Sequence, residues 1–382
     1  SNKNRINLGY KNEISDEFYI DGRASYKNRT DESFYTSGSA YTSTKERSEK
    51  EKSFAFNLFG VAEQELFGFG NDLSIGIDFE NCNYDYLEWG APNQVRGALS
   101  KDYKIKRNKF GPYLQDEIEL SQRMNFTLGC RYDLIKTEFV DNKVNANSND
   151  VSIDDFSYRA GATFFYLLNC KIYAVYSYAF RTPTIGQLFT YGSSSNSSLN
   201  TETGKNIELG LFHSFSDNIQ CGINLFTMKV DNEIWYDYSE KKYKNYGKTI
   251  HNGIEAKVEA SLDMGLNGFC NYTYNNAKND GGINDGKFIP NVPPHKVSLG
   301  LSYFSSFGLS TNLILTKVEE FYIDDPNTVK LDGFLNAKFG ASYKYGLIKV
   351  FVDIDNLFNK RYYPYGYMSG TTKYLNPAPE KR

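Results

Sequence analysis

The chain has 382 residues, with 43 Lys and Arg against 46 Asp and Glu, which gives a net charge of −3. Both signs of charge are dispersed, so the sequence lacks the basic stripe of a nucleic-acid-binding surface, and no nucleic-acid partner is expected. The hydrophobic fraction of 40% suits a folded protein, although the mean hydropathy is only −0.54. No apolar run approaches the roughly 18 residues that a membrane-spanning helix needs.

Alternation of apolar and polar residues predicts β-strands along the whole chain. Within 72–80, for example, Leu73, Ile75, Ile77 and Phe79 occupy every second position. The high aromatic fraction, 16%, also favours strands. We predict about 16 strands, at residues 4–11, 17–27, 52–66, 73–84, 110–120, 125–135, 156–167, 171–179, 206–213, 219–230, 247–262, 266–275, 296–303, 309–317, 335–343 and 347–356.

Short turns alternate with long polar connections between these strands. The short turns are expected at 13–16, 68–72, 121–123, 168–170, 215–218, 262–265, 305–308 and 345–346. The long connections are expected at 28–51, 84–108, 136–155, 180–205, 276–294 and 317–333, and the basic cluster 101–109 is interpreted as a solvated loop. Short turns at one end and long loops at the other are typical of an up-and-down transmembrane β-barrel.

Several predicted strands carry full charges at their centres on the polar face. Arg131 lies with Asp133, the stretch 255–259 contains Glu, Lys and Glu, and Asp353 lies with Asp355. A packed interior does not tolerate so many unpaired charges, whereas a wide aqueous or plugged lumen does. The fold class expected is therefore all-β, an antiparallel transmembrane barrel. The alternative is a soluble propeller, whose blades need four strands each and apolar residues on both sheet faces.

The sequence shows no clear metal-binding, redox or catalytic site. Five cysteines are far apart, three histidines are scattered, and no nucleophile–base set or phosphate loop is present, so neither an enzyme nor a cofactor is predicted. Asp150, Asp154 and Asp155 are the calcium candidates, with a solvated acidic turn as the alternative.

Four segments carry motifs of a known protein family. Residues 176–184 read Tyr-Ser-Tyr-Ala-Phe-Arg-Thr-Pro-Thr, and 198–210 read Ser-Leu-Asn-Thr-Glu-Thr-Gly-Lys-Asn-Ile-Glu-Leu-Gly. Near the C-terminus, 352–363 read Val-Asp-Ile-Asp-Asn-Leu-Phe-Asn-Lys-Arg-Tyr-Tyr, and 376–382 read Asn-Pro-Ala-Pro-Glu-Lys-Arg. In this order they resemble the barrel of TonB-dependent outer-membrane receptors. Two departures are Ser197-Ser198-Leu199 in place of the family's Asn-Pro-x-Leu and Thr201 where Pro is common.

The resemblance implies an outer-membrane location and part of a 22-stranded barrel. With short turns in the periplasm, both chain ends would lie outside the cell, so we expect that the sequence was cut at both ends. Residues 1–382 would form one barrel domain, without the plug domain, the first strands and the last strand. The implied partners are outer-membrane lipid and, through the missing plug, the energy-coupling protein TonB.

The function implied by the resemblance is active import of a scarce ligand, a ferric siderophore or cobalamin. Haem ranks lower, because haem-receptor relatives place a His in the loop that here lies between Arg181 and Glu202 and contains none. The alternatives are a passive porin-like channel and a surface adhesin or phage-docking barrel. Candidate ligand-binding residues are the aromatic and charged residues of the long loops: Arg181, Phe189, Tyr191, Trp235, Tyr236, Tyr238, Tyr322, Tyr365 and Tyr367.

Overall fold

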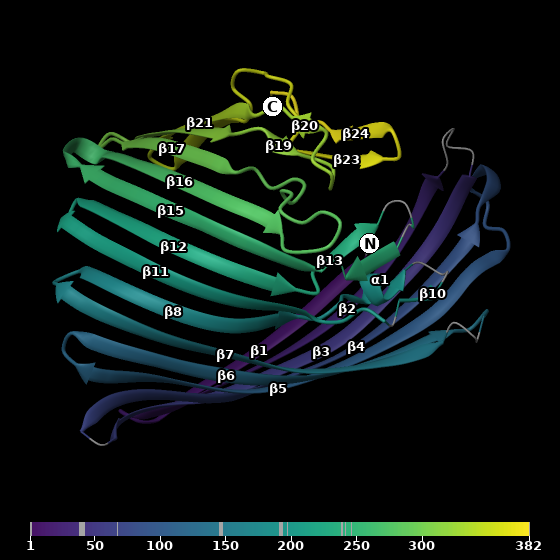
Figure 1. The fold of residues 1–382 in the computed structure, drawn as a ribbon, viewed down its shortest axis with the longest axis horizontal. Coiled ribbons are helices and arrows are strands. Elements are labelled where there is room, and N and C mark those ends of the chain that lie inside the picture. The colour runs from purple at the N-terminus through teal and green to yellow at the C-terminus, as the bar shows by residue number, and fades with distance from the viewer. Residues whose placement is uncertain are drawn as a thin grey trace.

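The protein, seen here as a computed structural model, is built around one strongly curved antiparallel sheet (Figure 1). The structure describes residues 2–37, 43–66, 68–144, 148–190, 194–196, 198–237, 240, 242–245 and 247–381. Within these residues the sheet has 16 strands, and strands that are consecutive in the sheet are also consecutive along the chain, with the first and last strands at its two edges. The number of strands and the all-β fold confirm the sequence prediction.

The strands of the large sheet are mostly long, and their direction turns progressively from β1 to the last strands of the sheet (Figure 1). They are β1 (Asn2–Ser15), β2 (Phe18–Ser37), β3 (Ser43–Leu66), β4 (Phe69–Gly90), β5 (Leu99–Ser121), β6 (Met124–Asp141), β7 (Asn149–Leu167), β8 (Cys170–Arg181), β11 (Glu202–Ser216), β12 (Ile219–Asp231), β15 (Lys248–Leu262), β16 (Leu266–Asn279), β17 (His295–Phe304), β18 (Leu309–Val318), β21 (Phe334–Tyr345) and β22 (Ile348–Ile354).

Smaller elements lie in the connections. The helical turns are η1 (Pro92–Gln94), α1 (Ile185–Leu188) and η3 (Asp263–Gly265). Among the described residues, separate two-stranded pairs are formed by β9 (Phe189–Thr190) with β10 (Ser194–Ser195), β13 (Ile234–Asp237) with β14 (Lys242–Asn245), β19 (Phe321–Tyr322) with β20 (Lys330–Leu331), and β23 (Tyr365–Ser369) with β24 (Thr372–Asn376).

The predicted short turns are confirmed, but three of the predicted long loops are wrong over most of their length. In the connections 28–51, 84–108 and 136–155, β2 to β7 continue as paired strands well past the predicted ends. The basic cluster 101–109, interpreted as a loop, lies inside β5. The extensions of β4 to β6 bury Tyr86, Tyr103, Ile105 and Phe139 on one face. Those of β2 and β3 are mostly polar on both faces, so they lack the alternation that marks a half-buried strand. Cross-strand ion pairs stabilise them instead, such as Lys27 with Glu51 at 2.5 Å.

A buried carboxylate joins the loop ends of β2 to β5. The side chain of Glu88 is only 1% exposed, and its carboxylate accepts hydrogen bonds from the hydroxyls of Tyr35, at 2.5 Å, and Tyr86, at 2.9 Å. The ammonium groups of Lys45 and Lys101 lie 3.0 Å and 3.7 Å away. Burial opposes ionisation, but the hydrogen bonds from Tyr35, Lys45 and Tyr86 and the charge of Lys101 outweigh it and lower the pKa of Glu88 to about 2.

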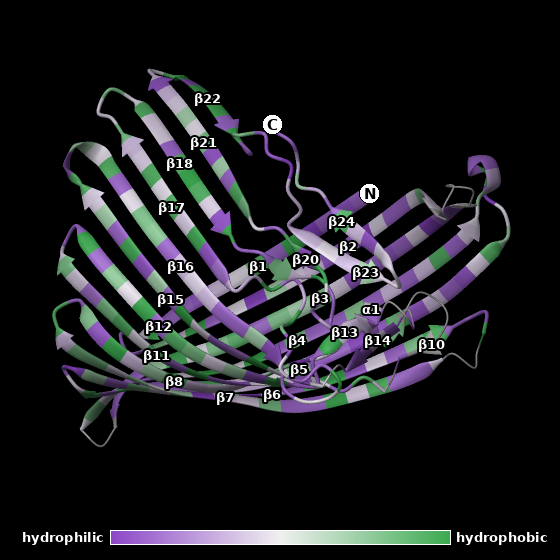
Figure 2. Ribbon diagram, turned by 45° about the horizontal axis from the view of Figure 1, so that its top comes forward, coloured by the Kyte–Doolittle hydropathy of each residue, from purple (hydrophilic) through white to green (hydrophobic). Residues whose placement is uncertain are grey.

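The two faces of the sheet differ as the alternation predicted. Apolar side chains on the convex face remain exposed, for example Ile75 at 53% and Leu209 at 50%, and hydrophobic and hydrophilic residues alternate along the strands (Figure 2). So much exposed apolar strand surface fits contact with lipid, not water. Among the described residues, no helix has both the length and the apolar character needed to cross a membrane.

The concave face carries the packed interior of the molecule near the loop ends of the strands. The segment around α1 lies inside the curve of the sheet (Figures 1 and 2). Its Leu188 and Phe189 pack against Tyr86, Tyr103 and Phe139 of β4 to β6, in a cluster that we call the loop core. A second, smaller cluster forms beside β23 and β24 around Val318, Phe321, Ile323 and Leu331.

Candidate ligand-binding site

Separate loops meet around a cavity of about 590 Å³, which we call the loop cavity. It brings together Trp235 of β13 and Tyr367 of β23, two of the aromatic residues predicted from the sequence to bind ligand. The remaining lining residues are mostly polar or charged: Asp237, Lys244, Asn245, Pro290, Ile323, Asp324, Asp325, Pro326, Thr328, Met368 and Gly370. Aromatic side chains beside a few polar groups are typical of small-molecule sites.

The wall of the loop cavity that contains Asp324 is held by hydrogen bonds to the backbone. The Asp324 carboxylate accepts hydrogen bonds from the backbone N–H of Thr328, at 2.9 Å, and of Val329, at 2.8 Å, which closes the turn between β19 and β20. The side chain of Asn327 bonds to Phe288 in the neighbouring loop, accepting from its N–H at 2.6 Å and donating to its carbonyl at 2.9 Å. Asn291 in turn accepts from the N–H of Gly366, at 3.2 Å. These contacts tie three connections together.

The charge of the loop cavity is predominantly negative. Among the residues that the structure describes, its lining includes Asp237, Asp324 and Asp325 and a single cation, Lys244. Lys244 is paired with Asp237 at 3.0 Å and with Glu240 outside the lining, and its hydrogen bonds to these carboxylates raise its pKa. One lysine shared between acidic groups leaves an excess of negative charge at the cavity wall.

The other predicted site residues occupy different surroundings. Arg181 forms a two-point ion pair with Glu202. Phe189 is 5% exposed and stacks on Phe139 in the loop core, with ring centroids 4.5 Å apart, so it packs the interior. Tyr322 stacks on Phe288 at 6.0 Å.

Tyr236 and Tyr365 pack against other tyrosines. Tyr236 lies edge-on to Tyr243 at 5.0 Å, and Tyr365 lies 6.3 Å from Tyr367. Tyr191 and Tyr238 lie outside the described residues.

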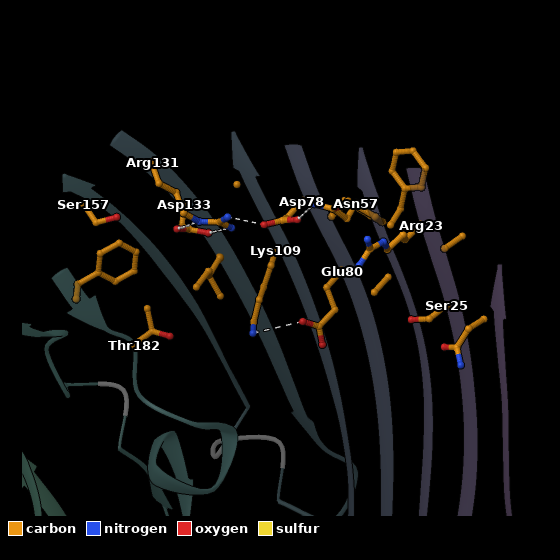
Figure 3. A pocket seen from close by; sticks show the side chains of 18 of the residues that line it. Arg23, Ser25, Asn57, Asp78, Glu80, Lys109, Arg131, Asp133, Ser157 and Thr182 are labelled. Carbon is orange, nitrogen blue, oxygen red and sulfur yellow. Dashed lines mark hydrogen bonds and ion pairs between the residues drawn. The ribbon is translucent and has the colours of Figure 1, made fainter. Parts of the chain in front are cut away.

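A second cavity, of about 950 Å³, lies against the concave wall of β1 to β8, and we call it the inner cavity. Figure 3 shows Arg131 between Asp78 and Asp133, with Lys109 beside Glu80. The guanidinium of Arg131 donates to Asp133 at 2.7 Å and also to Asp78. Gly111 makes this possible, because a Cβ at that position would overlap the Arg131 guanidinium. The mid-strand charges seen in the sequence thus form a paired network on the concave face.

The calcium candidates do not converge. All lie in β7, where Asp154 accepts a hydrogen bond from the Tyr132 hydroxyl at 2.9 Å. Asp154 and Asp155 are adjacent in a strand, so their side chains point to opposite faces. Over the described ranges, no three His, Cys, Asp or Glu residues are grouped as a metal site requires.

Sequence reasoning missed the acidic part of the loop cavity. Asp324 to Thr328 read Asp-Asp-Pro-Asn-Thr, a composition that predicts a turn and would have marked this segment as ordered. The contact between Asp237 and Lys244 could not be predicted from the sequence, because it depends on the pairing of β13 with β14.

Three features can be compared with known proteins. They are a single sheet whose strands pair in sequence order, an apolar convex face, and loops gathered at one end. A family model described as "TonB dependent receptor-like, beta-barrel" matches residues 1–357. The chain belongs to this family. TonB-dependent receptors are β-barrels of the outer membrane, and that is where this chain resides.

Individual relatives are similar over most of the chain. The ferrioxamine receptor of Yersinia enterocolitica is 25% identical over 291 residues, which cover 73% of this chain and 39% of that receptor. The ferrioxamine B receptor of Salmonella typhimurium is 26% identical over 316 residues, which cover 76% of this chain and 44% of that receptor. The chain therefore spans less than half the length of these curated relatives.

Solved structures of the family share the fold. The ferric citrate transporter FecA in its unliganded form has a TM-score of 0.82 at 16% identity, over 99% of this chain and 60% of that one. The siderophore receptor PiuA from Acinetobacter baumannii has a TM-score of 0.81 at 17% identity, over 99% of this chain and 63% of that one. At these identities the likeness concerns the fold alone.

Proposed function

We propose that this chain is the barrel part of an active importer that takes a ferric siderophore across the outer membrane. The observation that carries the proposal is membership of the TonB-dependent receptor family, whose relatives named above include ferrioxamine receptors. The chain is proposed to bind and pass its cargo without chemical change, so it is not an enzyme. Energy would come from the energy-coupling protein TonB.

The loop cavity is the proposed site of first contact with the cargo. Trp235 and Tyr367 offer aromatic surface to the organic part of a siderophore, and the polar lining offers hydrogen bonds. The negative excess of the lining disfavours anionic ferric complexes such as ferric catecholates. It favours a neutral or cationic ferric complex, and hydroxamate siderophores such as ferrioxamine form such complexes. None of the relatives named here is a cobalamin receptor, and cobalamin is the less supported cargo.

The proposal can be tested by iron uptake in cells that make the full-length protein. We expect uptake of radiolabelled ferric ferrioxamine B that stops when TonB is deleted. The double variant Trp235→Ala/Tyr367→Ala should lower affinity at least tenfold, because two aromatic rings of the cavity lining are removed. The matched control is Tyr322→Ala, which removes a loop tyrosine that packs on Phe288 outside the cavity.

Other outcomes identify the alternatives. Uptake that persists without TonB, with a steady conductance in planar bilayers, would indicate a passive channel. Binding of cells or phage without any uptake of ferric complexes would indicate an adhesin or docking barrel.

A further inference from the structure

Two lysines face each other directly on the outward face of the sheet. Lys205 of β11 and Lys229 of β12 are opposite partners in the antiparallel register, and both are exposed. Residues two apart on a strand share a face, so Lys205 lies on the same outward face of β11 as Ile207. Lys229 likewise lies on the same face of β12 as Leu225. Like charges placed directly opposite each other destabilise a strand pair. An anion that bridges the two ammonium groups would remove this repulsion.

The protein itself supplies no such anion among the described residues. Neither lysine has a salt bridge there, and the nearest acidic residue on this face, Asp231, is paired with Lys248 at 3.5 Å. Acidic residues such as Glu208 lie on the concave face of the sheet. Their side chains therefore point away from the two lysines, which lie on the outward face.

The lysine pair lies at the height where the apolar surface ends. Phe215, at the turn end of β11, is separated from Lys205 by ten residues. At about 3.3 Å per residue, along a strand tilted by about 40°, this corresponds to a height of about 25 Å. The apolar band of an outer-membrane barrel is about as tall. An anion between the lysines would therefore lie level with the lipid headgroups on the loop side of the membrane.

Tyrosines adjoin the lysine pair on one side. Tyr178 of β8 is the register partner of Lys205, and its ring stacks on Tyr158 of β7 with centroids 5.3 Å apart. Tyrosine rings at a membrane boundary contact acyl chains, while their hydroxyls donate hydrogen bonds to headgroups.

We propose that Lys205 and Lys229 form a binding site for a membrane lipid with a phosphate-bearing headgroup. The phosphate lies between the two ammonium groups, and the acyl chains run along the apolar rows below them. The exposed apolar surface directly beside the lysines identifies the anion as part of a lipid and not as a free ion. The site is on the outward face, separate from the loop cavity and the inner cavity, and does not depend on the imported cargo.

Native mass spectrometry of the full-length protein in maltoside micelles tests the site. The probes are bisphosphorylated lipid A and the same lipid without its phosphates. We expect the wild-type protein to retain the phosphorylated lipid about tenfold more strongly than the variant Lys205→Gln/Lys229→Gln. The matched control Lys257→Gln removes a lysine charge from the concave face of β15, where Lys257 pairs with Glu259 at 2.7 Å, and should bind as the wild type does.

Three results would overturn the proposal. These are equal retention by the wild type and the double variant, equal retention of both probes by the wild type, and full displacement of the lipid by millimolar inorganic phosphate. Thermal unfolding gives a second readout that does not depend on lipid counting. In lipid-free micelles, Lys229→Gln alone should unfold no earlier than the wild type, because a repulsive pair is removed, and phosphorylated lipid should protect only the wild type. Earlier unfolding of Lys229→Gln would also contradict the proposal.

Discussion

Substitution of Glu88 by Gln should destabilise the paired strands that extend beyond the membrane. In the folded protein the pKa of Glu88 is lowered from 4.5 to about 2 by its tyrosine and lysine partners. At about 1.4 kcal/mol for each pKa unit, this corresponds to roughly 3 kcal/mol at neutral pH. The glutamine amide would keep a hydrogen-bond acceptor but lose the attraction to Lys45 and Lys101. We expect Glu88→Gln to lower the local free energy of unfolding by about 2–3 kcal/mol at pH 7.

The pH dependence follows from the direction of the shift. Because the pKa is lower in the folded state, the stabilisation by Glu88 is complete above about pH 5. It is lost as the pH falls through 4.5 towards 2, where both states bind the proton. The difference between wild type and Glu88→Gln should therefore shrink over this interval and vanish near pH 2.

Trp89 provides the assay. The chain has 2 Trp residues, so a Trp235→Phe background leaves Trp89 as the sole reporter, next to Glu88 and with the Arg96 guanidinium 4.2 Å above its ring. Urea unfolding followed by Trp89 fluorescence gives the local free energy at each pH. The control Glu138→Gln removes an exposed carboxylate 3.9 Å from Lys106 and should change stability by less than about 0.5 kcal/mol. Equal stability of the two variants at pH 7 would refute the role assigned to Glu88.

Three further substitutions test the interior. Phe189→Ala should open a cavity in the loop core and weaken it by about 3–4 kcal/mol, seen as faster proteolysis of residues 180–205; unchanged cleavage would mean that Phe189 does not pack this loop. Gly111→Ala should displace the Arg131 guanidinium and lower the free energy of unfolding by about 1–3 kcal/mol. The control Gly9→Ala should leave stability unchanged, because a Cβ at Gly9 meets open space. Equal stability of the two variants would argue against a close contact between Gly111 and Arg131. Arg181→Ala should leave the Glu202 carboxylate, whose side chain is 9% exposed, without its guanidinium partner. Because Glu202 accepts a hydrogen bond from the backbone N–H of Ile234, hydrogen exchange at Ile234 should become faster. Glu202→Gln should accelerate this exchange less than Arg181→Ala does, and the reverse order would contradict a buried ion pair.

The sheet could be predicted from the sequence where one face is apolar, because alternation then marks each strand. The stretch 72–80 of β4 shows this, since its apolar residues alternate along the strand and share one face, on which Ile75 is 53% exposed. The extensions of β2 and β3 could not be predicted in the same way. In Glu49 and Lys50, for instance, both faces are polar, and pairing across strands decides the structure instead of burial.

The candidate site was predictable only in part, because its residues converge from distant loops. Trp235 and Tyr367 were selected as loop aromatics, but nothing in the sequence placed them around one cavity. Phe189 was selected for the same reason, yet it follows a helical turn whose capping box, Thr184 with Gln187, directs the segment inward. That capping signal is local and was available in the sequence.

The bonding order of the sheet has a consequence for how such proteins change over evolutionary time. Every strand of the sheet is bonded only to the sheet strands beside it in the chain, so no connection crosses another. A hairpin can therefore be duplicated, lost or exchanged as a unit without rerouting the rest of the chain. Changes in circumference and in the loops displayed to the outside become small genetic steps.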